Sequence, residues 1–266
     1  MTTAQTGTTA NGVPYLVVPA ASADAPVIVA WHLLDPPRTE VAMASALPLA
    51  GFDATKVYLG LPMSGSRTPA GGFDEIMRLG MEEPVMNLHW PIHEHAVAEF
   101  PAAFAELKQT FGIRDDAVLG LLGGSAGSSV AAGVLASGAT GARAAVFVSP
   151  MLQLAGMVDE LSEFFEMTYT WTEESRRAAA RMDFVARAPE LLATGAAMRV
   201  VVGADDSAGA TRPADAFAAA TGADLHVIPG LGHALAEEPG AEAAPQTPGA
   251  QQVDALASEW FAQHLR

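Results

Sequence analysis

The chain has 266 residues, of which 50% are hydrophobic and 17% charged, so it is long enough to bury one large core. It contains no cysteine, which excludes disulfides and thiolate metal sites, and its formal net charge of −16 argues against nucleic acid and anionic membranes as partners. No apolar run approaches the roughly 20 residues that span a bilayer, and the N-terminal segment MTTAQTGTTANG lacks the features of a secretory signal. We therefore expect a cytoplasmic protein that acts on a small molecule, without a nucleic-acid or membrane partner; composition indicates no oligomeric state.

Short apolar and β-branched runs recur along the chain and predict strands. They lie at 14–18, 26–33, 56–61, 117–123, 142–149, 198–203 and 224–229, and the turn-rich PAASADA between the first two predicts a hairpin. Helical apolar spacing marks 94–112, 128–137, 212–222 and 252–265. Nearly continuous apolar strands that alternate with helices are typical of a parallel sheet. The sequence therefore predicts an α/β fold, a mostly parallel central sheet with helices on both faces.

Two segments do not fit this alternation. Residues 62–92 form a long connection rich in Met, Gly and Pro, and residues 150–195 are helical in character but far longer than one crossover helix. Both leave the predicted sheet at the carboxyl ends of strands, where open α/β sheets bind their ligands. We therefore predict a helical cap at 150–195, inserted into a core made of 1–149 and 196–266. The cap is rich in Met and aromatic residues, and Phe165 is expected to face the substrate.

The stretch LLGGSAGSSVAAG, residues 121–133, places a G-x-S-x-G pattern between a predicted strand and a predicted helix. This arrangement is the nucleophile elbow, in which the serine sits on a strained turn above the sheet. Ser125 would be the nucleophile, and Gly123 and Gly127 lie where side chains would collide with neighbouring elements. The N–H of Ala126, at the start of the helix, would donate to a developing oxyanion.

A serine nucleophile needs a base, and the base needs an orienting carboxylate. With this elbow the acid is expected to follow the serine and the base to follow the acid. The predicted strand 198–203 runs directly into Asp205 and Asp206, and the strand 224–229 runs into a loop with His233 between Gly232 and Ala234. These strand ends supply both partners in the expected order.

With GGSAG, GADD and GLGH in these places, the chain resembles the α/β-hydrolase superfamily over nearly its whole length. The resemblance implies the α/β-hydrolase fold and favours Asp206 over Asp205, because the family places its acid three residues after the glycine. It also implies an oxyanion loop after the third strand, often beginning His-Gly, where this chain has His32 followed by Leu33. The second oxyanion donor is expected to be the backbone of Leu34, with Leu33 as the alternative, and both leucine side chains are expected to narrow the acyl pocket.

HWPIHEH, residues 89–95, raises the possibility of a metal site in place of a serine nucleophile, because His89, His93 and His95 could together bind a metal. Pro91 argues against a helix that would align the first two histidines, so we expect neither a metal nor a cofactor. The alternatives are that His89 forms a wall of the substrate cleft, or that the segment is a loop leading to a helix that starts at Glu94.

Together these residues predict a serine hydrolase that cleaves a carboxylic ester of a small acyl or aromatic substrate through an acyl-enzyme on Ser125. Asp206 and His233 would complete the triad. Two alternatives stay open. One is a peptidase or amidase of the same fold, and the other is a non-catalytic protein that binds a small ligand in the same pocket.

Overall fold

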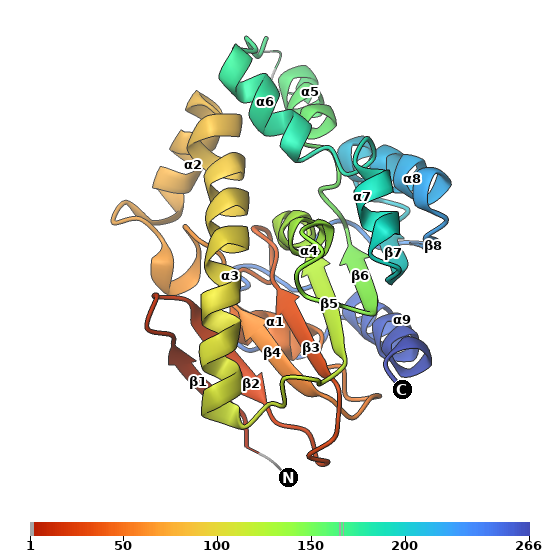
Figure 1. Ribbon diagram of the computed structural model, residues 1–266. Coiled ribbons are helices and arrows are strands. Elements are labelled where there is room, and N and C mark those ends of the chain that lie inside the picture. Colours follow the sequence, from red (N-terminus) through yellow and green to blue (C-terminus); the bar gives the residue numbers. More distant parts are fainter. Residues whose placement is uncertain (1–2, 165, 167) are drawn as a thin grey trace.

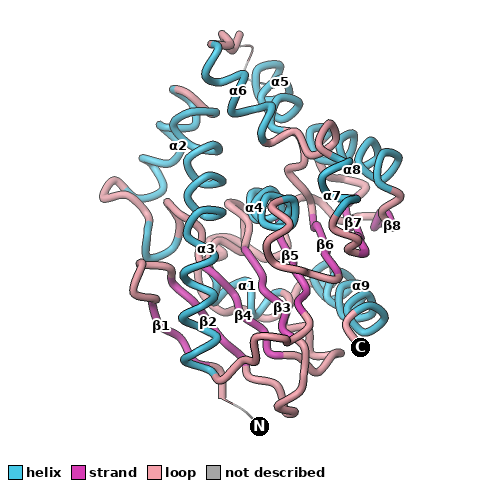
Figure 2. Tube along the Cα trace, viewed as in Figure 1, coloured by secondary structure: helices cyan, strands magenta, loops and turns pink. Residues whose placement is uncertain are grey.

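The central sheet runs through the whole molecule. The computed structural model describes residues 3–164, 166 and 168–266, and in this part eight strands form one sheet in the order β1-β2-β4-β3-β5-β6-β7-β8 (Figures 1 and 2). The strands are β1 Gln5–Thr8, β2 Pro14–Val18, β3 Val27–Trp31, β4 Thr55–Leu59, β5 Leu119–Gly124, β6 Ala144–Val148, β7 Ala197–Gly203 and β8 Asp224–Ile228. β1 and β2 are antiparallel to their neighbours, and β3 to β8 are mutually parallel. The carboxyl ends of the parallel strands therefore meet at one edge, as the predicted fold requires.

Both faces of the sheet are covered by helices. All side chains of β3 are buried, with Val29 and Trp31 in the hydrophobic cluster of one face and Ile28 and Ala30 in that of the other. The first face packs against α3 Trp90–Phe111, α4 Ala126–Ala136, α7 Ala188–Ala193 and α8 Ala208–Thr221. The second packs against α1 Glu40–Ala46 and α9 Pro248–His264. Burial on two sides explains why these strands are continuously apolar.

The predicted hairpin between 14–18 and 26–33 is wrong. β4 lies between β2 and β3, antiparallel to the first and parallel to the second. β2 instead forms a hairpin with β1, a strand that sequence analysis missed. β1 is the edge strand QTGT, mostly exposed and polar, so it carries no apolar alternation that could mark it as a strand.

The connection at 62–92 is more ordered than the sequence indicates. It contains α2 Gly72–Glu82 and the π-helical turn η2 Val85–His89, which leads directly into α3 at Trp90. The expected loop up to a helix start at Glu94 is therefore wrong. Pro91 does not prevent the earlier start, because it occupies the first helical turn, where a backbone N–H has no partner within the helix.

Two helices of the predicted cap lie beyond the carboxyl edge of the sheet. Figure 1 shows α5 Leu154–Phe164 and α6 Glu173–Arg181 on that side, with α2 facing them across the site. The third helix of the segment, α7, packs beside the sheet against α4 and α8. Among the helices of the described ranges, none combines the length and the hydropathy needed to cross a bilayer.

Candidate active site

The turn at Ser125 is strained and depends on its glycines. β5 ends at Gly124, α4 begins at Ala126, and Ser125 between them has φ 47° and ψ −116°. A Cβ at Gly123 would overlap the carbonyl oxygen of Gly127, and a Cβ at Gly127 would overlap that of His32. Side chains at these two positions would force the strand, the helix and the loop after β3 apart. The glycines therefore keep the serine held tightly above the sheet.

Ser125, His233 and Asp206 form one hydrogen-bonded series. The Ser125 hydroxyl lies 2.9 Å from His233 Nε2, and His233 Nδ1 lies 2.8 Å from Asp206 Oδ1. The Asp206 carboxylate is fully buried, so it accepts from Nδ1–H and thereby leaves Nε2 free to accept from the serine. This is the geometry of a nucleophile, a base and the group that orients the base.

Asp206 and His233 are brought together by a close contact between the loop after β7 and the loop after β8. A Cβ at Gly203, the last residue of β7, would overlap the carbonyl oxygen of Leu231, which also accepts from Asp205 N at 3.0 Å. Because the loops after β7 and β8 touch here, Asp206 reaches the ring of His233. Asp205 uses its backbone in this contact, and its exposed side chain forms no hydrogen bond or ion pair with a described residue.

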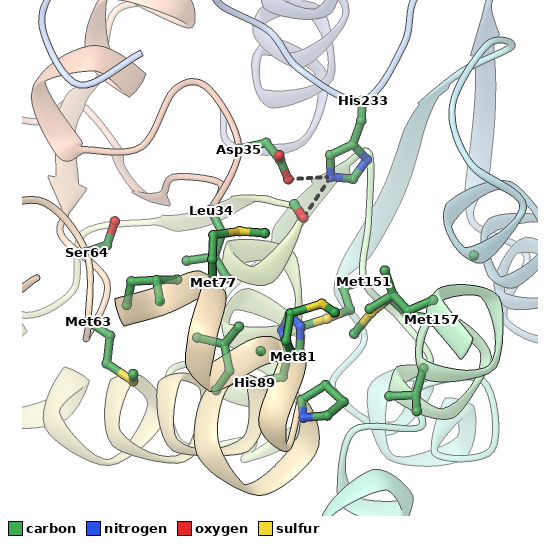
Figure 3. Close-up of a pocket in the computed structure, with 18 of the residues that line it drawn as sticks. Leu34, Asp35, Met63, Ser64, Met77, Met81, His89, Met151, Met157 and His233 are labelled. Carbon is green, nitrogen blue, oxygen red and sulfur yellow. Dashed lines mark hydrogen bonds and ion pairs between the residues drawn. The ribbon is translucent and has the colours of Figure 1, made fainter. Parts of the chain in front are cut away.

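Several charges act on His233. Burial disfavours the charged imidazole, but the hydrogen bond and the charge of Asp206 outweigh it, and the charges of Asp35 and Glu160 act in the same direction. The pKa of His233 is consequently raised above its ordinary value. Asp35 Oδ2 lies 3.7 Å from Nε2, the nitrogen that faces Ser125, as Figure 3 shows. The base therefore lies between two carboxylates, one buried and one half-exposed.

Two backbone N–H groups near Ser125 have no hydrogen-bond partner within the described ranges. One belongs to Ala126, the first residue of α4, and the other to Leu34. The N–H of Leu33 is not available, since it donates to the carbonyl of Pro37 at 3.2 Å. Of the two expected alternatives for the second oxyanion donor, the geometry thus favours Leu34.

The fully buried ring of His32 fixes the peptide that carries this donor. Leu61 N donates to His32 Nε2 at 3.0 Å, so the ring proton sits on Nδ1 and is donated to the Leu33 carbonyl at 2.6 Å. Burial lowers the pKa of His32 to about 4, which keeps the ring neutral. The Leu33 carbonyl and the Leu34 N–H belong to the same planar peptide and point in opposite directions. By holding one, His32 orients the other.

The expectation that Leu33 lines the substrate pocket is wrong. Its side chain is fully buried in the hydrophobic cluster that packs against α9, and it fills the space beside Gly124, where a Cβ would overlap it. Leu34 does face the pocket (Figure 3). Of the two leucines, only Leu34 therefore lines the cavity in the described part of the chain.

A cavity of about 1430 Å³ opens next to Ser125 and His233, between α2 and α5. Its wall is largely apolar and contains five methionines (Figure 3): Met63, Met77, Met81, Met151 and Met157. Arg38 is the lone Lys or Arg among the described residues of the wall, and its guanidinium pairs with Glu238 at 2.5 Å. Among the described residues of the wall, no Lys or Arg is therefore left free to bind an anionic group. Phe165, expected to face the substrate, lies outside the described residues.

The three histidines of HWPIHEH do not converge. His89 lines the cavity, His93 is buried between the rings of Trp90 and Phe184, and His95 is exposed. His93 Nδ1 also lies 3.3 Å from the hydroxyl of Ser129 on α4. In the described part of the chain, no three His, Cys, Asp or Glu side chains are placed to hold a metal ion. Only His89 of the three is in contact with the site.

Glu160 anchors α5 next to the triad. Its carboxylate accepts from the N–H groups of Ala208 and Gly209, at 3.0 and 2.6 Å, and these belong to the first turn of α8. A carboxylate at a helix N-terminus is stabilised both by the unpaired N–H groups and by the helix dipole. The residue thus ties the helix that forms one wall of the cavity to the loop that carries Asp206.

Glu160→Gln should lower the free energy of unfolding by about 1–2 kcal/mol, because one charge-assisted hydrogen bond and the interaction with the helix dipole are lost. Hydrogen exchange of the α5 amides should become faster, and KM should rise. Glu163→Gln, an exposed change on the same helix, is the control and should leave all three unchanged. Equal effects of the two variants would show that Glu160 is not an anchor.

Comparison with solved structures identifies the architecture. The chain is similar to a dienelactone hydrolase from Anabaena variabilis, with 16% identity and a TM-score of 0.58 over 99% of both chains. It is also similar to an alpha/beta hydrolase enzyme from the sediment metagenome of the lagoon of Mar Chica, Morocco, with 17% identity and a TM-score of 0.56 over 97% of this chain and 98% of that one. The chain has the α/β-hydrolase fold.

Some solved structures match this chain only through one part of their own length. A puromycin-hydrolyzing peptidase of Mycobacterium tuberculosis has 15% identity and a TM-score of 0.64, over 99% of this chain but 39% of the peptidase. No protein-family model and no curated protein matches the sequence. Since this fold supports many chemistries, the function has to be argued from the site.

Proposed function

We propose that the chain is a serine hydrolase that cleaves a carboxylic ester through an acyl-enzyme on Ser125. The observation that carries this proposal is the hydrogen-bonded series from Ser125 through His233 to the buried Asp206, placed at the wall of an apolar cavity. A protein that only binds a ligand has no use for this complete set of three groups.

In the acylation step, Ser125 Oγ attacks the ester carbonyl while His233 Nε2 takes the hydroxyl proton. The carbonyl oxygen becomes an oxyanion, and the N–H groups of Ala126 and Leu34 would stabilise it. The buried charge of Asp206 stabilises the imidazolium that forms. When the tetrahedral intermediate collapses, the C–O bond to the alcohol breaks and His233 returns the proton to the departing oxygen. The acyl group stays on Ser125.

Deacylation repeats these steps with water. His233 takes a proton from a water molecule, the hydroxide attacks the acyl carbonyl, and the same two N–H groups hold the oxyanion. Collapse returns the proton to Ser125 and releases the carboxylic acid. The net reaction consumes one ester and one water and yields one acid and one alcohol, with no cofactor among the reacting groups.

Access to Ser125 would be limited by the inserted segment 150–195, acting as a cap on the core formed by 1–149 and 196–266. The placement of α5 and α6 beyond the sheet edge supports this role, with α2 as the facing wall (Figure 1). The cavity between them is larger than the roughly 300–1,000 Å³ of common small-molecule sites. A small-molecule ester with a sizeable apolar part fits such a space.

An ester is preferred over a peptide because the cavity wall is mostly apolar. A peptide substrate brings several backbone polar groups that would need partners when buried. Some proteins of similar fold are peptidases, so an amidase or peptidase remains the alternative within the enzyme class. Rates with matched p-nitrophenyl esters and p-nitroanilides would separate the two, and the proposal expects the esters to be cleaved faster.

Labelling with a fluorophosphonate probe distinguishes a serine hydrolase from a non-catalytic protein that only binds a small ligand. The probe should attach to the folded native protein, because an activated serine attacks its phosphorus, and the adduct should map to Ser125. Ser125→Ala should not be labelled, whereas Ser137→Ala, which removes a serine beyond the far end of α4, should label as the native chain does. A folded native protein that stays unlabelled would favour a non-catalytic ligand-binding protein.

A further inference from the structure

His89 is an unpaired polar side chain in the wall of the cavity. It stands where η2 meets α3, and it lines the same cavity as Met81 and Met151 (Figure 3). Its Nδ1 is buried without a hydrogen-bond partner, and no hydrogen bond to Nε2 is formed by any described residue. Nε2 is not among the closed-off atoms, so a bound molecule can give this ring a hydrogen-bond partner only through Nε2.

The protonation state of the ring determines what it can recognise. Burial lowers the pKa of His89 to about 4, so the ring is neutral at pH 7 and carries one proton. Nδ1 is closed off, and Nε2 is the nitrogen that a bound molecule can reach. Since buried N–H groups without partners are rarer than unpaired acceptors, we place the proton on Nε2. His89 therefore offers a single N–H donor to the cavity.

The other groups of the wall exclude a charged ligand for this donor. Five carboxylates line the cavity, namely Asp35, Glu82, Glu83, Glu160 and Glu238, and they would repel an anion. The Arg38 guanidinium, the lone Lys or Arg group of this wall among the described residues, is already paired with Glu238. A cation would bind the carboxylates and gain nothing from an N–H donor. The group that suits His89 is an uncharged acceptor oxygen.

We infer that His89 recognises an uncharged oxygen, keto or ether, within an apolar chain of the substrate. This inference rests on the proposed ester hydrolysis and names its substrate class: an ester with a long apolar chain interrupted by one acceptor oxygen away from the scissile bond. His89 Nε2–H donates to that oxygen while the methionines pack against the methylene groups on either side. A chain without the oxygen leaves the donor unpaired, and that difference is the source of selectivity.

Two series of octanoate-sized esters test this inference. Every ester carries one keto oxygen, and its position moves along the chain from one ester to the next. In the first series the oxygen lies in the acyl chain of p-nitrophenyl esters, and in the second it lies in the alcohol chain. In the native protein one keto position should be preferred over the all-methylene ester by about tenfold in kcat/KM. His89→Leu should reduce this ratio to about 1, and His89→Gln, whose amide can still donate, should retain part of it.

His95→Leu is the matched control, because it makes the same change at an exposed histidine of the adjoining helix α3, and it should keep the native ratio. The absence of a preferred keto position, or a preference that persists in His89→Leu, would overturn the inference while leaving ester hydrolysis intact. If no ester is cleaved, the proposed function fails, and the nitrogen resonances of His89 decide the inference separately. Addition of the keto compounds to Ser125→Ala should shift Nε2, and unchanged resonances would reject the role.

Discussion

Asp206→Asn should lower kcat by about 10⁴-fold at neutral pH, the loss expected when a Ser-His-Asp triad loses its carboxylate. Asp206 Oδ1 accepts from His233 Nδ1 at 2.8 Å, which leaves Nε2 unprotonated and ready to take the serine proton. An asparagine can present its NH₂ group to Nδ1, which then becomes the acceptor. The ring proton moves to Nε2, and the base faces Ser125 in the wrong tautomer. Steady-state kinetics with an activated ester would measure the loss.

Asp205→Asn is the matched control for this experiment. It makes the same chemical change one residue earlier, at an exposed side chain that does not contact His233. Its kcat should stay within about twofold of the native value, and the unfolding free energies of both variants should be measured alongside. If Asp205→Asn lost more activity than Asp206→Asn, the acid would be wrongly assigned.

Loss of activity in acid should begin at a higher pH than an unperturbed histidine would give. The base must be neutral to take the serine proton, and the pKa of His233 is raised because Asp206, Asp35 and Glu160 together outweigh the effect of burial. The plot of kcat/KM against pH should therefore rise with a midpoint above 6.5, the ordinary value for histidine. Each pH unit below that midpoint should lower kcat/KM by about tenfold.

Asp35→Asn tests how much the charge of Asp35, apart from that of Asp206, raises the pKa of His233. Removing a carboxylate 3.7 Å from Nε2 makes protonation of His233 less favourable, so the midpoint should move to lower pH. Asp115→Asn removes an exposed carboxylate that precedes β5, at the opposite end of the strand from Ser125, and should leave the midpoint in place. A midpoint that did not respond to Asp35→Asn would show that this carboxylate is screened by solvent.

The sequence by itself determined two kinds of feature in this protein: the tight turn at Ser125, which depends on local sterics, and the placement of residues that directly follow predicted strands. A side chain at Gly123 would overlap the backbone of Gly127, only four residues away. The need for glycine at this position can therefore be read directly from the G-x-S-x-G pattern. The meeting of His233 with an acid after β7 was also predictable, because the carboxyl ends of parallel strands must meet at one edge. Strand ends alone left Asp205 and Asp206 open, and the resemblance to the α/β-hydrolase superfamily favoured Asp206. The alternation of strands and helices that indicated the α/β fold is of the same local kind.

Only the tertiary structure decided which neighbours each residue meets across the sheet and the site. The insertion of β4 between β2 and β3, the burial of Leu33 beside Gly124 and the engagement of its N–H by Pro37 all depend on elements packing against one another. The different surroundings of His89, which faces the cavity, and His93, which packs in the core, also depend on this packing between elements. Periodicity reports how a segment divides between apolar and polar surroundings. It does not report which distant segment supplies those surroundings, because that choice is made by the packing of the whole chain.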